Sequence, residues 1–190
     1  MKETMFFDSC FPEYEQLPRS FIIDFDTIYR GCKILTKITY GNQQVGDFID
    51  DNSREKDNYR FHDVFHYSFA AVLGWSPCSR SMMKRKRKSN PDIDDFEDGA
   101  RAIITEEAIS LMIFNYAKKR NLLAGDNCID SKSLEFIKDF TSPFEVSVCT
   151  EQDWEKAIFL GYSLFRSLVE NNGGRISFDM INKTGTFSSN

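Results

Sequence analysis

The sequence predicts an all-α fold: four to six helices around one long central helix, with a C-terminal helix and a short hairpin or tail. Three observations favour this class. Apolar residues recur at near-helical spacing in several segments, and residues 103–117 are apolar on nearly every side of a helix. Residues that begin or end helices, such as Thr150 and Gly74, flank these segments. Because 190 residues suffice for one domain with a sizeable core, we expect a single domain over residues 1–190.

The first third of the chain predicts helices separated by one long loop. The apolar spacing in residues 21–38 indicates a helix or a helix pair, with a break at Gly31. Residues 40–58 are polar and rich in glycine and asparagine, which predicts a loop of functional length. Residues 59–73 then predict an amphipathic or largely buried helix that stops at Gly74.

The longest helix is predicted over residues 94–120, at the centre of the bundle and surrounded by other helices. It completes the core that carries the motifs, residues 59–120. Before it, the Ser-Pro pair at 76–77 begins a short helix that runs into a basic segment. The remaining expected elements are a modest helix at 131–140, a helix at 151–170 capped by Thr150, and a strand, hairpin or ordered tail at 175–187.

Composition excludes several classes of protein. A net charge of −5 and a pI near 5.1 disfavour a general nucleic-acid-binding role. Five widely spaced cysteines without a CxxC pair indicate neither a disulfide framework nor a cysteine zinc site. Residues 1–12 hold no long apolar core, and no apolar run is long enough to cross a bilayer. We therefore expect a cytoplasmic protein that is not bound to a membrane.

The two histidines of the chain, His62 and His66, lie four residues apart in the segment HDVFH. Residues one turn apart share a helix face, and two imidazoles placed in this way suit a metal ion. Asp63 would add an oxygen ligand or orient a histidine. The alternative is that both histidines are hydrogen-bonded core or interface residues and that Asp63 is an ordinary helix acid.

Adjacent glutamates form the second candidate group. Glu106 and Glu107 lie in ITEEAISLMIF, where apolar neighbours predict that at least one carboxylate is buried and partnered. Asp95 lies eleven residues before Glu106, which predicts a mostly acidic ridge on one helix. For the acids at 92–95, neutralisation by surface salt bridges is the better interpretation.

A basic run at residues 84–88 follows Arg80 by one turn. Such a run is usually a solvated face, and sometimes a localisation signal or a nucleic-acid patch. Its place between the histidine segment and the glutamate segment predicts instead that it binds phosphates. Trp75 is interpreted either as a stacking face for a base or as a core residue. The candidate phosphate-binding residues are Arg80, Lys84, Arg85, Lys86 and Lys88.

This order of motifs resembles the MazG type of all-α nucleoside triphosphate pyrophosphohydrolases. The resemblance rests on RFHDVFHYSFAAVLGWSPCSRSMMKRKRKS followed by EDGARAIITEEAIS, and is greatest to a MazG-related branch of bacteria and their mobile elements. It covers residues 59–118, about a third of the chain. It implies Mg²⁺ held by acids on two helices, and hydrolysis of an NTP or dNTP to the monophosphate and pyrophosphate.

Three of the five carboxylates that the family uses are replaced in this chain. The family's EExxE motif falls on His62, Asp63 and His66, and its ExxD motif falls on Glu107 and Ser110, with Glu106 beside them. Imidazole prefers Zn, Mn, Fe or Ni to Mg, so the metal could differ, or turnover could be lost. HD-type phosphohydrolases are a second analogy, but their further histidines are absent from the sequence.

The leading hypothesis is a metal-dependent nucleotide pyrophosphohydrolase, with Mg²⁺ or Mn²⁺ as the cofactor and an NTP or dNTP as the substrate. The alternative is a catalytically weakened nucleotide-sensing or scaffold subunit of a phage-defence or toxin-linked system. We expect a homodimer or tetramer, and a protein encoded in the same operon is a further candidate partner. The predicted catalytic residues are Asp63, Glu106 and Glu107, and the predicted metal ligands are His62, Asp63, His66, Glu106 and Glu107.

Overall fold

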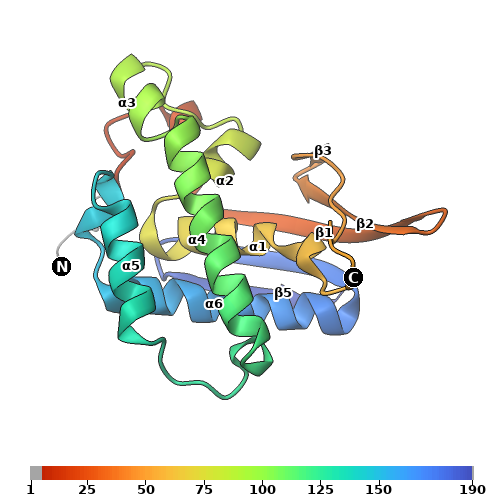
Figure 1. The fold of residues 1–190 in the computed structure, drawn as a ribbon. Coiled ribbons are helices and arrows are strands. Elements are labelled where there is room, and N and C mark those ends of the chain that lie inside the picture. Colours follow the sequence, from red (N-terminus) through yellow and green to blue (C-terminus); the bar gives the residue numbers. More distant parts are fainter. Residues whose placement is uncertain (1–5, 190) are drawn as a thin grey trace.

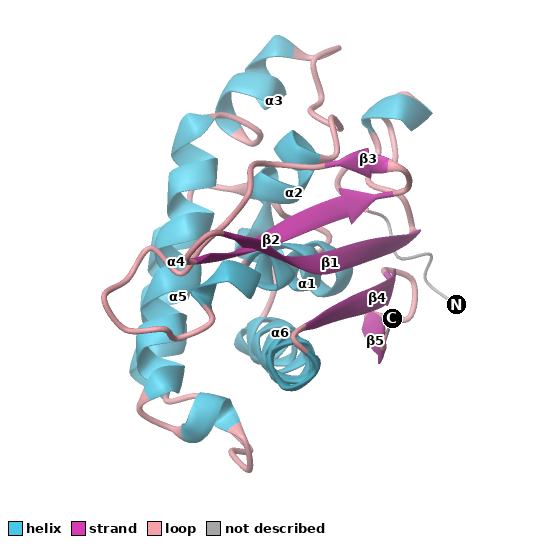
Figure 2. Ribbon diagram, turned by 90° about the vertical axis from the view of Figure 1, so that its right-hand side faces the viewer, coloured by secondary structure: helices cyan, strands magenta, loops and turns pink. Residues whose placement is uncertain are grey.

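The computed structural model describes residues 6–189 and shows a mixed α/β fold, so the predicted all-α class is wrong. About 47% of the chain is helical, and 18% forms one antiparallel sheet of five strands in the order β3-β2-β1-β4-β5. Figures 1 and 2 show the sheet on one side of the molecule and most of the helical mass on the other. The fold has two layers rather than the bundle that the sequence predicted.

A long hairpin occupies the segment that was predicted as helical. It consists of β1 (Ser20–Arg30) and β2 (Lys33–Tyr40). Phe21, Ile23 and Phe25 are buried, whereas the side chains between them are not, so the burial has the period of two that defines a strand. Gly31, with φ of 59°, takes the first position of the two-residue turn, where hairpins require a positive φ. It marks a turn and not a break in a helix.

The sheet also joins the two ends of the described chain. β4 (Gly173–Asp179) and β5 (Thr184–Ser188) form the hairpin that was one of the alternatives for this segment. β4 pairs antiparallel with β1, with Ser20 opposite Asp179. On the other side of β2, the polar stretch 40–58 contains the short β3 (Gln43–Gln44) and a single backbone bridge to β2.

The helix at the centre of the fold is α1 (Asp63–Leu73), in which all eleven residues are buried. It contacts strands β4 and β5 of the sheet, and it also contacts several of the other helices. It ends at Gly74, as predicted. α6 (Glu151–Asn171) packs along it, with the expected cap at Thr150, and α5 (Ser131–Thr141) packs against α6. At 21 residues, α6 is the longest helix of the described chain.

The long helix predicted over 94–120 is two helices, α3 (Pro91–Phe96) and α4 (Ala100–Lys118). The break is built around Gly99, where a Cβ atom would lie 2.0 Å from the backbone oxygen of Asp95. Asp95 and Glu106 therefore lie on different helices, and the predicted acidic ridge is wrong. The short α2 (Pro77–Met82) precedes them and begins at Ser76 as expected.

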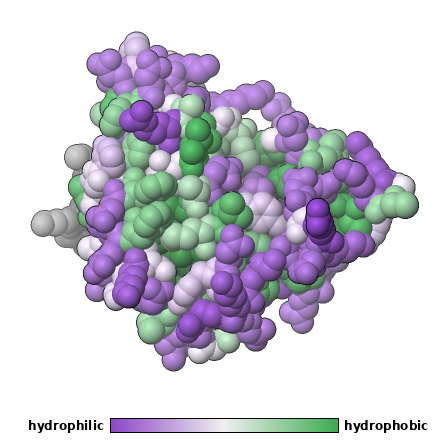
Figure 3. All heavy atoms as spheres, in the orientation of Figure 1, coloured by the Kyte–Doolittle hydropathy of each residue, from purple (hydrophilic) through white to green (hydrophobic). Residues whose placement is uncertain are grey.

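One side of α4 is not covered by other elements, contrary to the expectation for a central helix. Ile104 is 67% exposed and Leu111 is 47% exposed, and two stacked phenylalanines of α5, Phe136 and Phe140, are also largely exposed. Figure 3 shows hydrophobic side chains gathered on this face, over α4 and α5. We call these four residues the α4–α5 face.

All five cysteines are free thiols. The sequence predicts that they are buried or half-buried, which is wrong for three of them: Cys78 is buried and Cys149 half-buried, but Cys10, Cys32 and Cys128 are exposed. None of the helices in residues 6–189 combines the length and the apolar character that a membrane crossing requires. The first five residues of the N-terminal stretch lie outside the described residues.

Candidate metal centre

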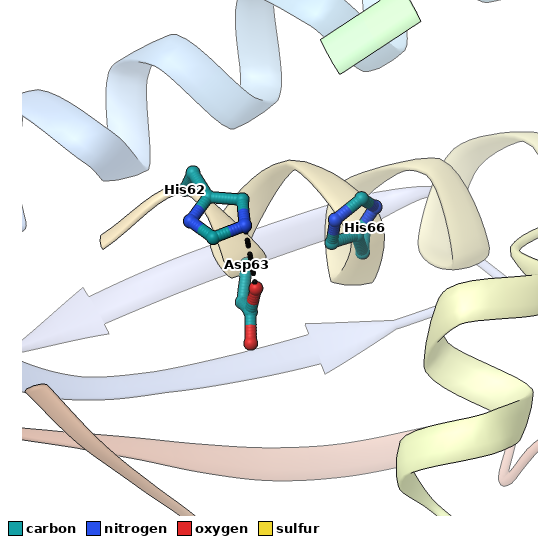
Figure 4. A group of neighbouring side chains, drawn as sticks. All are labelled: His62, Asp63 and His66. Atoms are coloured by element: carbon teal, nitrogen blue, oxygen red, sulfur yellow. Dashed lines mark ion pairs between the residues drawn. The ribbon is translucent and has the colours of Figure 1, made fainter. Parts of the chain in front are cut away.

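The structure brings the histidine segment together with one residue each of α2 and α4. His62, at the N-terminal end of α1, and Asp63 and His66 of α1 lie close together, as Figure 4 shows. Their ligand atoms all lie within 4.8 Å of one another, and the same holds for His66, Cys78 and Glu107. Because His66 belongs to both groups, we treat these five residues as one unit, the histidine cluster.

Glu106 is fully buried and partnered, as the sequence predicted for one of the two glutamates. Its Oε1 accepts a hydrogen bond from the Ser76 hydroxyl at 2.6 Å and pairs with Nδ1 of His66 at 2.9 Å. Its Oε2 accepts the backbone N–H of Cys78 at 2.8 Å. Both oxygens are engaged in these contacts, and the role of Glu106 as a metal ligand and catalytic residue stays a prediction. Glu106 orients His66 and anchors the start of α2.

The orientation of His66 leaves its second nitrogen without a hydrogen bond. The ring is 1% exposed, and its Nδ1 is held by Glu106, so Nε2 points toward Oε1 of Glu107 at 3.4 Å. Burial by itself would lower the pKa of His66, but the neighbouring Cys78 and Glu106 raise it well above the ordinary value. In the protein alone, a buried imidazolium paired with two carboxylates is therefore favoured.

His62 presents a lone pair to the cluster. Its Nδ1 lies 3.0 Å from the carbonyl oxygen of Tyr59, which can only accept, and its ring stacks on Tyr59 at 4.3 Å. Burial lowers the pKa of His62, so the neutral ring is favoured. Nε2 then faces Oδ1 of Asp63 at 3.1 Å with a lone pair, along the dashed line of Figure 4. Two such acceptors face one another favourably when a cation lies between them.

Arg80 was predicted to bind phosphate but is a structural residue. It is 1% exposed and forms ion pairs with Asp8 at 2.8 Å and Asp98 at 3.6 Å. Burial by itself would raise the pKa of Asp8, but its hydrogen bonds with Arg19 and Arg80 hold it below the ordinary value. An ionised Asp8 thus neutralises Arg80, and no free charge remains for a ligand.

The rest of the basic run is divided between two roles. Arg87 is buried against Asp98, and Arg85 donates to the backbone oxygen of Glu13. The three lysines of the run line a hollow of about 450 Å³ together with Tyr14, Glu15 and Ser81. Lys84, Lys86 and Lys88 therefore share one hollow that a phosphate could enter, and the half-buried Arg85 lies outside its lining.

Trp75 is a core residue, which is the second of its two interpretations. It is 1% exposed and packs against Phe144 and Trp154, with ring centroids 6.0 and 6.2 Å away. A nucleobase cannot reach its face, so the predicted stacking role is corrected. Sequence reasoning missed Cys78 instead, because its distance in sequence from both His66 and Glu107 follows no helical or motif spacing.

Comparison with known protein families matches residues 2–190 to the family described as MazG C-terminal domain. The match extends far beyond residues 59–118, on which the resemblance in the sequence rested. No curated protein and no solved structure matched the chain significantly. The strands, the buried α1 and the histidine cluster thus belong to one family unit, and the chain is a member of the MazG C-terminal domain family.

Proposed function

We propose that the protein is a metal-dependent nucleotide pyrophosphohydrolase, which cleaves an NTP or dNTP to the monophosphate and pyrophosphate. The histidine cluster carries this proposal. It gathers two imidazoles, two carboxylates and a thiol from three helical segments, and one buried imidazole nitrogen in it has no hydrogen bond. Membership of the MazG C-terminal domain family supports the same class of chemistry.

The residues of the cluster fit a divalent cation, which the resemblance implies is Mg²⁺ or Mn²⁺. Asp63, Glu107 and the two histidines would hold it, and Glu106 would keep His66 in the required orientation. A bound divalent ion would supply neutralisation of phosphate charge and polarisation of the phosphoryl group. Glu107 is the most accessible member, because its side chain is 44% exposed, and it gives the cluster its contact with solvent.

The lysine hollow supports a substrate with several phosphates. Cys78 of the cluster and Ser81 of the hollow are three residues apart on α2, and such residues share one side of a helix. Lys84, Lys86 and Lys88 would bind phosphate oxygens as point charges.

A specific observation favours the alternative of a nucleotide sensor or scaffold subunit. Among the predicted phosphate ligands, Arg80 is neutralised by buried ion pairs with Asp8 and Asp98. Transition-state charge would then be stabilised by Arg85 and the lysines of the run. The expected dimer or tetramer remains a prediction, and the α4–α5 face is the surface that it would use.

The test is a screen of the NTPs and dNTPs with Mg²⁺, Mn²⁺ and Zn²⁺ that measures pyrophosphate release. We expect turnover of at least one nucleotide and a loss of roughly 100-fold or more in kcat/KM for Glu107→Gln, because the amide keeps the shape but not the charge. Glu135→Gln, an exposed change on α5, is the matched control and should retain activity. Wild-type turnover by Glu107→Gln would contradict the proposal, and nucleotide binding without any pyrophosphate release would favour the sensor.

A further inference from the structure

Three donor atoms in the histidine cluster lie at the separations expected around one metal ion. Nε2 of His66 and Oε1 of Glu107 are 3.4 Å apart, and Sγ of Cys78 is 3.9 Å from the same oxygen. His66 Nε2 is buried and has no hydrogen-bond partner. The nitrogen, the sulfur and the oxygen come from α1, α2 and α4 respectively, so tertiary packing brings them together.

These separations match a tetrahedral zinc site. Bond lengths of about 2.1 Å to nitrogen and oxygen and about 2.3 Å to sulfur place tetrahedral ligands about 3.4 Å apart for a nitrogen and an oxygen, and about 3.6 Å apart for a sulfur and an oxygen. We propose that His66, Cys78 and Glu107 bind a zinc ion and leave its fourth coordination position open.

The chemistry of the donors selects zinc over magnesium. Mg²⁺ takes oxygen ligands in octahedral geometry, whereas a thiolate and an imidazole are ligands for softer ions such as Zn²⁺. The buried position of Cys78, with its backbone N–H held by Glu106, fixes the sulfur beside His66. Glu106 also accepts from Nδ1 of His66, which is the arrangement of a carboxylate that orients a zinc-bound histidine.

The open position is bordered by the remaining two members of the cluster. Nε2 of His62 and Oδ1 of Asp63 are 3.1 Å apart, and each of these residues has a ligand atom within 4.8 Å of one of His66. The partly exposed Glu107 side chain provides a route from solvent. Three protein ligands and an accessible fourth position are typical of zinc sites that act on a substrate, rather than of closed structural sites. The inference rests on the proposed function but changes its ion and its ligands: zinc takes the place of the Mg²⁺ or Mn²⁺ that the resemblance implies, and His62 and Asp63 border the ion instead of binding it.

Metal binding by the purified full chain tests the inference without an activity assay. The chain is stripped with a chelator, and zinc is titrated in competition with a chromophoric chelator; Co²⁺ is then titrated as a spectroscopic probe. We expect one tightly bound ion per chain and a thiolate-to-cobalt charge-transfer band. Cys78→Ser should abolish the band and weaken zinc binding at least tenfold, and Glu106→Gln should weaken it roughly 10- to 100-fold.

Cys149→Ser is the matched control, because Cys149 is a half-buried thiol outside the cluster, and it should keep both the band and the affinity. Glu107→Gln, whose side chain is partly exposed, provides a second ligand variant that should fold normally. A cobalt band that persists in Cys78→Ser, or a wild-type chain that binds no zinc, would overturn the inference. Zinc binding with the thiolate band but without pyrophosphate release would support the zinc site and contradict the proposed function. Turnover with Mg²⁺ alone by a chain that binds no zinc would support the proposed function and contradict the zinc site.

Discussion

Glu106 and Glu107 are neighbours in the sequence but differ in environment. Successive residues on a helix point about 100° apart, so Glu106 faces His66 and the start of α2 while Glu107 faces the edge of the cluster. The buried Glu106 carboxylate has three contacts shorter than 3 Å, whereas the partly exposed Glu107 carboxylate has only longer contacts, to His66 at 3.4 Å and Cys78 at 3.9 Å. Glu107 is therefore the better candidate to bind a cation, and its replacement is the sharper test of activity.

Glu97 is a second carboxylate with an unusual environment. Its two oxygens accept the backbone N–H of Glu145 at 3.1 Å, but burial raises the pKa of Glu97 to about 7, with the nearby Glu145 charge adding to the effect. Because the folded-state pKa lies above the unfolded value of about 4.5, the folded state binds more protons between these values. The stability contribution of Glu97 is complete below pH 4.5 and is lost as the pH rises through 7.

Glu97→Gln should therefore stabilise the protein at pH 8 and have little effect at pH 4.5. The amide keeps an acceptor for Glu145 and carries no charge to desolvate, and we expect a gain of about 1 kcal/mol at pH 8, allowing for solvent screening. Urea unfolding at the two pH values measures the difference, with the exposed Glu135→Gln as the control. An equal effect at both pH values would contradict the assignment of the pKa.

Sequence spacing could predict only part of the candidate site. His62, Asp63 and His66 lie within one helical turn, so their convergence follows from the periodicity of a single element. Cys78 joins them only because α2 and α1 pack side by side, and nothing local encodes that contact. The role of Arg80 was misjudged for the same reason, since its partner Asp8 lies 72 residues away in the chain.

At the scale of elements, the junction between α3 and α4 depends on Gly99, which has a hydrogen atom where any other residue has a Cβ atom. Gly99 has φ of −85°, which any residue can adopt, so what requires glycine here is the close approach of the Asp95 backbone oxygen. A methyl group at this position would force α3 away from α4. The turn at Gly31 differs, because its Cβ would meet no atom within 4 Å and its φ of 59° alone favours glycine.

Gly99→Ala should accordingly cost about 2–3 kcal/mol of unfolding free energy, and Gly31→Ala about 1 kcal/mol. The first value reflects overpacking against backbone that cannot rotate away, and the second reflects strain in an open turn. The denaturant midpoints of the two variants show which substitution costs more unfolding free energy. A smaller loss for Gly99→Ala than for Gly31→Ala would show that the junction relaxes easily.

The wrong fold class comes mainly from one segment, residues 21–38, which was predicted as helix and forms strands. Most of the other predicted helices are present. Caps and terminators located α1, α2, α5 and α6, since these signals act within a few residues. In residues 21–38, apolar residues at mixed spacing fit both a helix and a strand, and β1 pairs with β2 through the Gly31 turn and also with β4 some 150 residues later. A partner so distant has no signature within the segment.

At the scale of the whole molecule, one buried ion-pair network ties distant segments together. Asp98, at the α3–α4 junction, pairs with Arg87 at 2.7 Å and with Arg80 at 3.6 Å. Arg80 continues to Asp8 in the N-terminal segment, and Arg87 continues to Glu145 before α6. The network therefore links the N-terminal segment, α2, α4 and the region before α6, and its central carboxylate is fully buried.

Asp98→Asn should destabilise the protein by about 3 kcal/mol or more, because it leaves two buried guanidinium groups without their shared counter-charge. Asp24→Asn is the matched control, since Asp24 pairs with Arg175 at the surface and should contribute less than about 1 kcal/mol. Thermal and urea unfolding of both variants measure the contrast. Equal losses would mean that the network contributes little to stability.

The pairing of β1 with β4 also sets an order of assembly during synthesis. On a ribosome, the β1–β2 hairpin and all five residues of the histidine cluster emerge long before residues 173–179 exist to occupy the other side of β1. α1 packs on β4, β5 and α6, so the layer that supports His62, Asp63 and His66 cannot close until the last strands arrive. The nascent chain thus carries the candidate metal-binding side chains early, but the layer that supports them can form only once residues 173–188 have been made.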